Sequence, residues 1–346
     1  LTITGCEFKE NSANEGQAIY GSNNIIQFVI TDTNFNSNVN TGQSEDIDEP
    51  QYIIVLEIGS FDISNVNFNN TNNQNKISYP ILFKSFNTIS DLVFSNVNSN
   101  YSPIMYISHK NSIKFDTITF INCNTNQFII ESNGQFEFSN SQILFDTHEN
   151  IKSIKISGGN ADLQNSLFSQ TGPAVEISRN ANEVIINECN FTDCYSSVSN
   201  PSLAVIHISN RLATISNNII NFTSNSDQKS ISGLYIERHG DLQVTNNKFI
   251  KIRNAFDKSE GGGILIQDRK EDNSNGIVIF NYNLIEDVGN KKMSVFGIKK
   301  YYNFNFDYNT VRNCFINDYS CQINLANNKV FGLEYTLTGH SLINCE

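Results

Sequence analysis

Apolar residues recur along the chain in a hexapeptide with the pattern apolar, any, Asn-like, any, any, apolar. The first position is apolar in all 13 copies and the sixth in 12, the exception being Ser99. Successive copies are about 27 residues apart on average, and the spacing varies, which is typical of a repeat whose corners accept insertions. The copies are Ile3–Phe8, Ile30–Phe35, Ile63–Phe68, Phe94–Ser99, Phe115–Phe120, Phe138–Ile143, Leu163–Phe168, Ile186–Phe191, Ile215–Ile220, Val244–Phe249, Ile279–Leu284, Phe306–Val311 and Leu325–Val330.

A second apolar stretch lies between successive hexapeptides, as in Ile104–Ile107 and Val205–Ile208. Alternation with a period of two over such short stretches predicts strands, and the chain lacks the i, i+3, i+4, i+7 stripe of a helix. Two or three strands per repeat, separated by tight polar corners, predict an all-β fold: a single-stranded right-handed parallel β-helix, or solenoid, of about 13 coils. At about 4.8 Å per coil, this is a rod roughly 60 Å long.

Asparagine occupies the third hexapeptide position in eight copies. Asparagine tolerates the left-handed backbone conformation that a tight corner requires. Its amide can also bond to an equivalent amide one coil above. We therefore expect an asparagine ladder along the axis, formed by Asn65, Asn96, Asn140, Asn165, Asn217, Asn246, Asn281 and Asn327.

The repeat covers almost the whole chain, which predicts one β-helix domain over residues 1–346. The chain starts inside a repeat, at Leu1, which favours a segment of a longer polypeptide. Longer corner insertions are expected near residues 39–52, 72–80, 196–203, 223–232 and 257–275.

Charge and composition exclude some classes of function. The net charge of −12 and the sequence pI near 4.9 argue against a nucleic-acid partner. The longest apolar run, Tyr52–Leu56, is far shorter than the roughly 20 residues of a membrane-spanning helix.

The seven cysteines lack CxxC spacing, so a zinc site is not expected. We likewise expect no other metal and no cofactor. Two readings of the cysteines stay open. They are buried free thiols, or an oxidising compartment allows disulfides that close short loops. The candidates for disulfides are Cys189, Cys194, Cys314, Cys321 and Cys345.

Near the N-terminus, Phe8-Lys9-Glu10-Asn11, then Ala13, then Glu15-Gly16-Gln17-Ala18-Ile19-Tyr20 follow one another. This stretch resembles the FxxN and GGAI repeats of the polymorphic outer-membrane proteins, a branch of the pectin-lyase-like β-helix superfamily. Residues 35–38 repeat the first half, and residues 261–264 resemble a diverged second half. The resemblance implies an extracellular or surface-exposed rod of adhesive or structural use, within a larger protein.

Catalytic signatures of polysaccharide-cleaving β-helices, such as paired aspartates, are missing from the sequence. One constellation follows from register: Lys155, Glu176, His207 and Tyr235 are expected to align on the outward face of consecutive coils. Glu176 beside His207 is a candidate pair for proton transfer or sugar binding, although polar residues on a solvated sheet face are ordinary. The acidic loop 45–49 lacks the spacing of an EF-hand, and a solvated insertion is the simpler interpretation.

Four Asn-x-Ser/Thr sequons begin at Asn69, Asn100, Asn190 and Asn221. Each lies one residue before or after an inward position, so each asparagine is expected to point outward, where a glycan fits.

Three functions remain. The first is a non-catalytic, extracellular or cell-surface structural or adhesive rod, whose open ends pair with further coils or with other copies of itself, as in a filament. The second is a polysaccharide lyase or hydrolase of the pectin-lyase-like superfamily, acting through Glu176 and His207. The third is a glycan-binding module that uses outward Tyr106 and Tyr235.

Overall fold

The chain forms an all-β parallel solenoid in a computed structural model. The structure describes residues 2–9, 12–13, 19–21, 27–36, 39–40, 51–56, 60–69, 72–73, 78–83, 87–99, 103–107, 112–147, 151–194, 204–209, 212–222, 232–237, 240–254, 263–267, 277–290, 296–299, 303–312, 315–316, 323–324, 334–336 and 341–343. No helix occurs among these residues. The predicted fold class is therefore confirmed, whereas the right-handed winding stays a prediction.

The contacts divide the chain into two compact units, Leu1–Asp162 and Leu163–Glu346. Each unit is a stack of coils built from parallel strands, and strand β20 (Gly159–Gln164) contains the boundary. About seven turns can be interpreted, fewer than the 13 coils predicted, because the connections of the outer coils lie outside the described residues. The predicted corner insertions also lie largely outside them.

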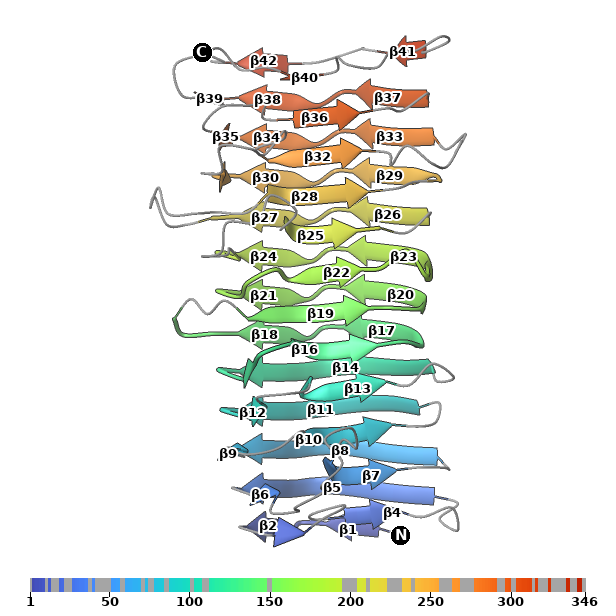
Figure 1. The fold of residues 1–346 in the computed structure, drawn as a ribbon, viewed down its shortest axis with the longest axis vertical. Helices are drawn as coiled ribbons and strands as arrows, with labels where there is room; N and C mark the ends of the chain where they lie inside the picture. Colours follow the sequence, from blue (N-terminus) through green and yellow to red (C-terminus); the bar gives the residue numbers. More distant parts are fainter. Residues whose placement is uncertain are drawn as a thin grey trace. The chain divides into compact units, whose positions relative to one another are not determined.

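In the first unit, two parallel sheets alternate along the chain, and short strands form a third set at the corners (Figure 1). The first sheet contains β1 (Thr2–Thr4), β2 (Glu7–Lys9), β5 (Gln27–Asn36), β8 (Ser60–Asn69), β11 (Asn87–Ser95), β14 (Ser112–Ile121), β17 (Gln135–Ser139) and β18 (Gln142–Leu144). The second contains β4 (Ile19–Gly21), β7 (Gln51–Leu56), β10 (Ser78–Phe83), β13 (Met105–Ile107), β16 (Phe128–Ser132) and β19 (Lys152–Ile156). The corner strands are β3 (Ser12–Ala13), β6 (Val39–Asn40), β9 (Asn72–Asn73), β12 (Asn98–Ser99) and β15 (Asn124–Thr125).

The second unit repeats this plan. Its first sheet contains β21 (Leu167–Ser169), β23 (Ala181–Asn187), β24 (Asn190–Thr192), β26 (Leu212–Ser216), β27 (Ile219–Asn221), β29 (Leu242–Thr245), β30 (Lys248–Ile250), β33 (Ile277–Asn281), β34 (Leu284–Glu286), β37 (Asn303–Asp307), β38 (Thr310–Arg312), β41 (Glu334–Thr336) and β42 (Ser341–Ile343). Its second sheet contains β22 (Val175–Ile177), β25 (Ala204–Ile208), β28 (Ser232–Glu237), β32 (Ile264–Gln267), β36 (Phe296–Lys299) and β40 (Ile323–Asn324). The corner strands are β31 (Arg253–Asn254), β35 (Gly289–Asn290) and β39 (Phe315–Ile316).

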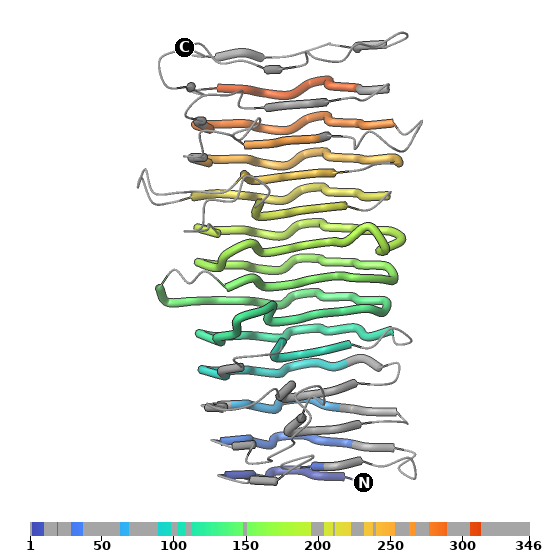
Figure 2. Tube along the Cα trace, viewed as in Figure 1, coloured from blue at the N-terminus to red at the C-terminus, as the bar shows by residue number. Residues whose placement is uncertain are grey.

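Alternating burial explains why these segments are strands. In β14, inward and outward residues alternate on each side of Thr117, where the backbone turns with φ 59°. The trace then passes to the second sheet and returns through β17 and β18, as Figure 2 shows for residues 112–147. Each coil thereby places the strands of both sheets around one interior.

Equivalent inward side chains lie directly over one another. In the first unit five phenylalanines form one stack, with ring centroids 4.7–4.9 Å apart and interplanar angles of 6–9°. In the second unit Phe168 stacks on Phe191 at 4.9 Å, and Phe280 on Phe306 at 5.4 Å. The superposition of apolar groups that the hexapeptide predicts is confirmed within each unit. The five stacked phenylalanines are Phe8, Phe35, Phe68, Phe94 and Phe120.

Strand pairing corrects the register of two hexapeptides. Ile89 pairs with Ile63 and Phe94 with Phe68, so the repeat in this coil is Ile89–Phe94 rather than Phe94–Ser99. In the second unit Val244 pairs with Phe280, which shifts the copy predicted at Ile279–Leu284 by one residue. At Ile279 the error arises because the neighbouring apolar residue Phe280 also fits the pattern, and at Phe94 because Asn96 fits the third position although Ser99 does not fit the sixth. Only the pairing between coils distinguishes the alternatives.

Candidate functional site

In the described coils, the first corner lies at the third hexapeptide position, and its backbone is left-handed. Eleven non-glycine residues adopt φ between 45° and 59° there. Five of the predicted ladder asparagines are among them, with the conformation expected of asparagine at a tight corner. The eleven residues are Asp32, Asn65, Asp91, Thr117, Asn140, Asn165, Glu188, Asn217, Asn246, Tyr282 and Tyr308.

The other three predicted ladder residues lie elsewhere. Asn96 is left-handed but occupies the second corner of its coil, in the same place as Asn122 one coil later. Asn281 ends β33, one residue before the corner, which Tyr282 occupies. Asn327 lies outside the described residues.

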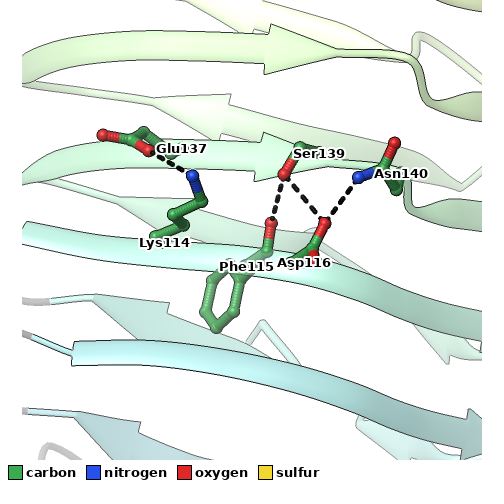
Figure 3. Close-up of polar contacts among 6 residues, drawn as sticks. All are labelled: Lys114, Phe115, Asp116, Glu137, Ser139 and Asn140. Atoms are coloured by element: carbon green, nitrogen blue, oxygen red, sulfur yellow. Dashed lines mark hydrogen bonds and ion pairs between the residues drawn. The ribbon is translucent and has the colours of Figure 1, made fainter.

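Three corner asparagines contact the preceding coil through their amides, and Figure 3 shows one of them, Asn140. Asn140 donates from Nδ2 to Oδ1 of Asp116 at 2.7 Å, and Ser139 donates to the same oxygen at 3.2 Å. Asn65 donates to Asp32 at 2.5 Å, and Asn217 to Asn187 at 2.8 Å. For these three asparagines, the acceptor is therefore not the predicted asparagine of the neighbouring corner.

A continuous asparagine ladder exists one position further along the chain, inside the second unit. Asn218, Asn247, Asn283 and Asn309 are each at most 1% exposed. Each of the first three donates from Nδ2 to Oδ1 of the next, at 3.0, 3.1 and 3.1 Å. Each also donates its backbone N–H to that oxygen, at 2.8–3.0 Å. We call these four residues the inner ladder. The doublets Asn217-Asn218 and Asn246-Asn247 were the sequence signal for it.

Cys189 precedes the inner ladder and takes the same inward place in its coil. Its backbone N–H donates to Oδ1 of Asn218 at 2.9 Å, and its thiol contacts the carbonyl oxygen of Leu163 at 3.6 Å. Cys194, at the next corner, has its own contact with the carbonyl oxygen of Phe168 at 3.4 Å. Both residues are buried free thiols here, which is the first of the two readings that the sequence left open.

Burial controls the chemistry of the inward cysteines. Loss of hydration raises the pKa of Cys123 to about 12 and that of Cys194 to about 12, against an ordinary value of 9.0. Such thiols stay protonated at neutral pH and are poor nucleophiles. Cys314, Cys321 and Cys345 lie outside the described residues.

The outward column predicted on the second sheet is present in the second unit. Glu176 in β22 pairs with His207 in β25, which pairs with Tyr235 in β28. The imidazole of His207 stacks on the Tyr235 ring, with centroids 4.8 Å apart. Lys155 belongs to the first unit, where its Nζ lies 3.5 Å from Glu131.

His207 lines a pocket of about 260 Å³. Glu237, two residues after Tyr235 on the same strand face, accepts a hydrogen bond from the tyrosine hydroxyl at 3.2 Å. Its other carboxylate oxygen lies 3.8 Å from Nε2 of His207. The lining residues are Glu176, Ile177, Ser178, Arg179, His207, Ser209 and Glu237. Period two from Tyr235 was the signal that could have identified Glu237.

The contacts of His207 define what this pocket can do. Oγ of Ser209 lies 3.3 Å from Nε2, the same ring nitrogen that faces Glu237. A nucleophile–base–carboxylate relay needs its two partners on opposite nitrogens of the imidazole. The arrangement therefore suits recognition of hydroxyl and charged groups better than activation of Ser209.

The tyrosines proposed for sugar stacking are less accessible than expected. Tyr235 is 5% exposed and packs with Ala204 and Leu265, so its ring is covered. Tyr106 is partly buried, and its hydroxyl accepts a hydrogen bond from Nδ2 of Asn133 at 2.7 Å. A bound sugar would therefore contact the pocket groups rather than the faces of these rings.

Two sequon asparagines can be placed. Asn190 is exposed, and the Thr192 hydroxyl donates to its Oδ1 at 3.2 Å. Asn221 is partly buried, and its buried Oδ1 accepts no hydrogen bond from the described residues. The side chain of Asn69 and the whole of Asn100 lie outside them.

No cluster of three His, Cys, Asp or Glu side chains able to hold a metal ion occurs among the described residues. They also contain no helix with the length and apolar character needed to cross a bilayer. The acidic loop 45–49 lies outside them.

Comparisons of the chain with family models, with curated proteins and with solved structures gave no match.

Proposed function

We propose that the chain is a non-catalytic structural or adhesive rod, exposed outside the cell and able to extend by adding coils end to end. The observation that carries this proposal is the stacking of like on like in the interior. In the first unit phenylalanine rings lie on one another with centroids 4.7–4.9 Å apart, close to the distance between parallel strands. In the second unit the asparagines of the inner ladder are joined by hydrogen bonds from coil to coil. An interior of this kind lets a further coil continue the same columns.

The terminal strands support extension. Within the described residues, β1 pairs only with β5, and β41 only with β37. A further strand in parallel register beside either of them would continue the same backbone ladder. The resemblance of the first coils to polymorphic outer-membrane repeats, within the pectin-lyase-like superfamily, supports a surface location in the same proposal.

The test is electron microscopy and sedimentation of the purified chain over a range of concentrations. We expect particles one coil in width whose length grows with concentration. Successive backbone N–H groups of a strand point to opposite sides, so one of the adjacent residues Tyr335 and Thr336 in β41 points its N–H away from β37. The proline variant at that residue, Tyr335→Pro or Thr336→Pro, removes this N–H and should shorten the particles. Thr336→Ser is the matched control. Monomers at every concentration would contradict extension.

A second candidate, a glycan-binding module, is favoured by the pocket around His207. Carboxylates, an imidazole, hydroxyls and Arg179 at the rim offer both donors and acceptors to sugar hydroxyls or acidic sugars. A glycan array probed with the chain should show binding that falls in His207→Ala and Glu237→Gln. Glu131→Gln, an outward carboxylate in the first unit, is the control. Cleavage of a bound glycan that Glu176→Ala and His207→Ala abolish would instead support the lyase or hydrolase alternative.

A further inference from the structure

Two tyrosines in consecutive coils of the second unit form an exposed stacked pair. The rings of Tyr282 and Tyr308 have centroids 5.0 Å apart and an interplanar angle of 4°. The two residues are 57% and 51% exposed, which makes them the most exposed large apolar side chains of the described residues. Their phenol edges are therefore open to a reagent in solution.

Both tyrosines occupy the left-handed first corner, with φ of 59° and 55°. Bulky residues with positive φ are uncommon, and five of the other described coils carry asparagine there. Two adjacent coils thus hold the same aromatic residue in an unfavourable conformation. A pair of outliers of this kind is a reason to look for a role of the side chains.

The inner ladder fixes the spacing of the pair. Asn283 and Asn309 directly follow the two tyrosines, and Nδ2 of Asn283 donates to Oδ1 of Asn309 at 3.1 Å. The backbone N–H of Tyr282 also donates to the carbonyl oxygen of Asp307 at 3.1 Å. The backbone beneath both rings is therefore held in register, while the rings themselves can still rotate at the surface.

We propose that Tyr282 and Tyr308 are a site of oxidative cross-linking, at which a dityrosine bond joins two neighbouring coils. A haem peroxidase with hydrogen peroxide is the class of oxidant required. It removes one electron and one proton from each phenol, and the two phenoxyl radicals couple through the ring carbons ortho to the oxygens. The hydrogen on each coupled carbon then moves to the phenol oxygen. In sum, two phenols and one hydrogen peroxide give one dityrosine and two waters.

The fold keeps the two phenols side by side, and coupling requires the face-to-face rings to turn about the side-chain bonds until their ortho carbons meet edge to edge. Holding two reacting groups in place replaces an encounter by an intramolecular step. The product would covalently join β33–β34 to β37–β38 at the surface, independently of whether the chain extends end to end. It would therefore add a cross-link without changing the interior.

The experiment treats the purified folded chain, at low concentration, with a haem peroxidase and hydrogen peroxide. We expect dityrosine fluorescence in the monomer, and a linked peptide pair containing Tyr282 and Tyr308 whose mass is two hydrogens below the sum of the peptides. Tyr282→Phe and Tyr308→Phe should each reduce this product to background. Phenylalanine retains the ring stacking, so both variants should fold, which circular dichroism checks. Tyr106→Phe is the matched control and should leave the yield unchanged.

Three results would overturn the proposal. The first is fluorescence that persists unchanged in both variants, and the second is a product that consists only of covalent dimers of the chain. The third is an equal share of the 282–308 link in chain unfolded with urea, where all 13 tyrosines compete. Each would show that the folded geometry does not direct the coupling.

Discussion

The assignment of the inner ladder predicts that two adjacent asparagines contribute very differently to stability. Asn246 and Asn247 are consecutive, yet Asn246 is an exposed corner residue with φ 57° and Asn247 is 1% exposed. We expect Asn247→Ala to destabilise the fold by several kcal/mol and Asn246→Ala by much less. The pair is its own control, because both changes remove the same atoms from neighbouring positions.

The magnitude follows from the hydrogen bonds of Asn247. Its Oδ1 accepts from the backbone N–H and the amide of Asn218, both at 3.0 Å. Its Nδ2 donates to the carbonyl oxygen of Ile215 at 2.9 Å. Truncation leaves a buried N–H and a buried carbonyl without these partners, and each costs about 1–3 kcal/mol. The sum is roughly 2–6 kcal/mol.

For Asn246 the loss is mainly conformational. Alanine is less tolerant of the left-handed region than asparagine, at a cost of roughly 1–2 kcal/mol. Urea unfolding followed by far-ultraviolet circular dichroism measures both changes, with equal slopes required before midpoints are compared. An Asn246→Ala midpoint as low as that of Asn247→Ala would refute the assignment of the ladder to the inner position.

Three further predictions concern packing, pH and backbone conformation. Phe68→Ala should destabilise the fold by about 3–5 kcal/mol, because the ring is fully buried between the rings of Phe35 and Phe94, and Phe68→Leu should destabilise it less. A urea unfolding midpoint of Phe68→Ala that equals the wild-type midpoint within error would contradict this prediction. Stability should fall as pH rises from about 9 toward about 12, because the unfolded chain ionises Cys123 and Cys194 while the folded chain, with both pKa values raised to about 12, does not. Replacing Cys123 and Cys194 by Ser should weaken the pH dependence of the unfolding free energy, measured by urea titration at several pH values. A pH dependence that stays the same in the double variant would contradict this prediction. Gly159→Ala should destabilise the fold by at least about 2 kcal/mol, because Gly159 has φ +70° and a Cβ there meets the backbone of the neighbouring coil. Gly5→Ala should destabilise it less, because Gly5 has a similar φ of +64° but open space around it. Equal melting temperatures of the two variants would argue against the close approach at Gly159.

The hexapeptide predicted the strands and the parallel stacking because both depend on local alternation and on repeated apolar positions. It predicted the register less well. Phe94 closes the hexapeptide of one coil, but it also begins a stretch that matches the pattern at its first position and at Asn96, and fails it only at Ser99. The choice depends on its pairing with Phe68 in the preceding coil, which is a contact between residues far apart in sequence. A pattern within one segment of the sequence contains no information about that contact.

The asparagines show the same limit at the level of side chains. Their preference for left-handed backbone is local, and five of the eight predicted ladder residues do occupy the first corner. Which of two consecutive asparagines faces inward is decided by the strand that follows: Lys248 is exposed and Phe249 buried, so Asn247 must be inward. The sequence contained this information in Lys248-Phe249, and reading the ladder from the strand rather than from the corner would have recovered it.

The pocket and the tyrosine pair differ from the interior in which residue types lie next to each other in consecutive coils. Inward columns repeat one residue type only over some coils, as in the phenylalanine stack of the first unit, and elsewhere Phe and Ile alternate, as in Phe191, Ile220 and Phe249. What they share is apolar character or, in the inner ladder, a side chain that bonds to the next coil. Outward columns have no such requirement, and Glu176, His207, Tyr235 and Leu265 follow one another on the second sheet. Dissimilar neighbours there form a recess with polar walls, which is a property of this part of the chain and not of the repeat. Tyr282 and Tyr308 are the converse case, an identical aromatic pair where packing does not demand one.

If function were spread evenly over the repeat, replacing outward residues in any coil should have similar effects. Variants confined to these two places should instead change sugar binding and cross-linking separately, with the stability of the solenoid unchanged.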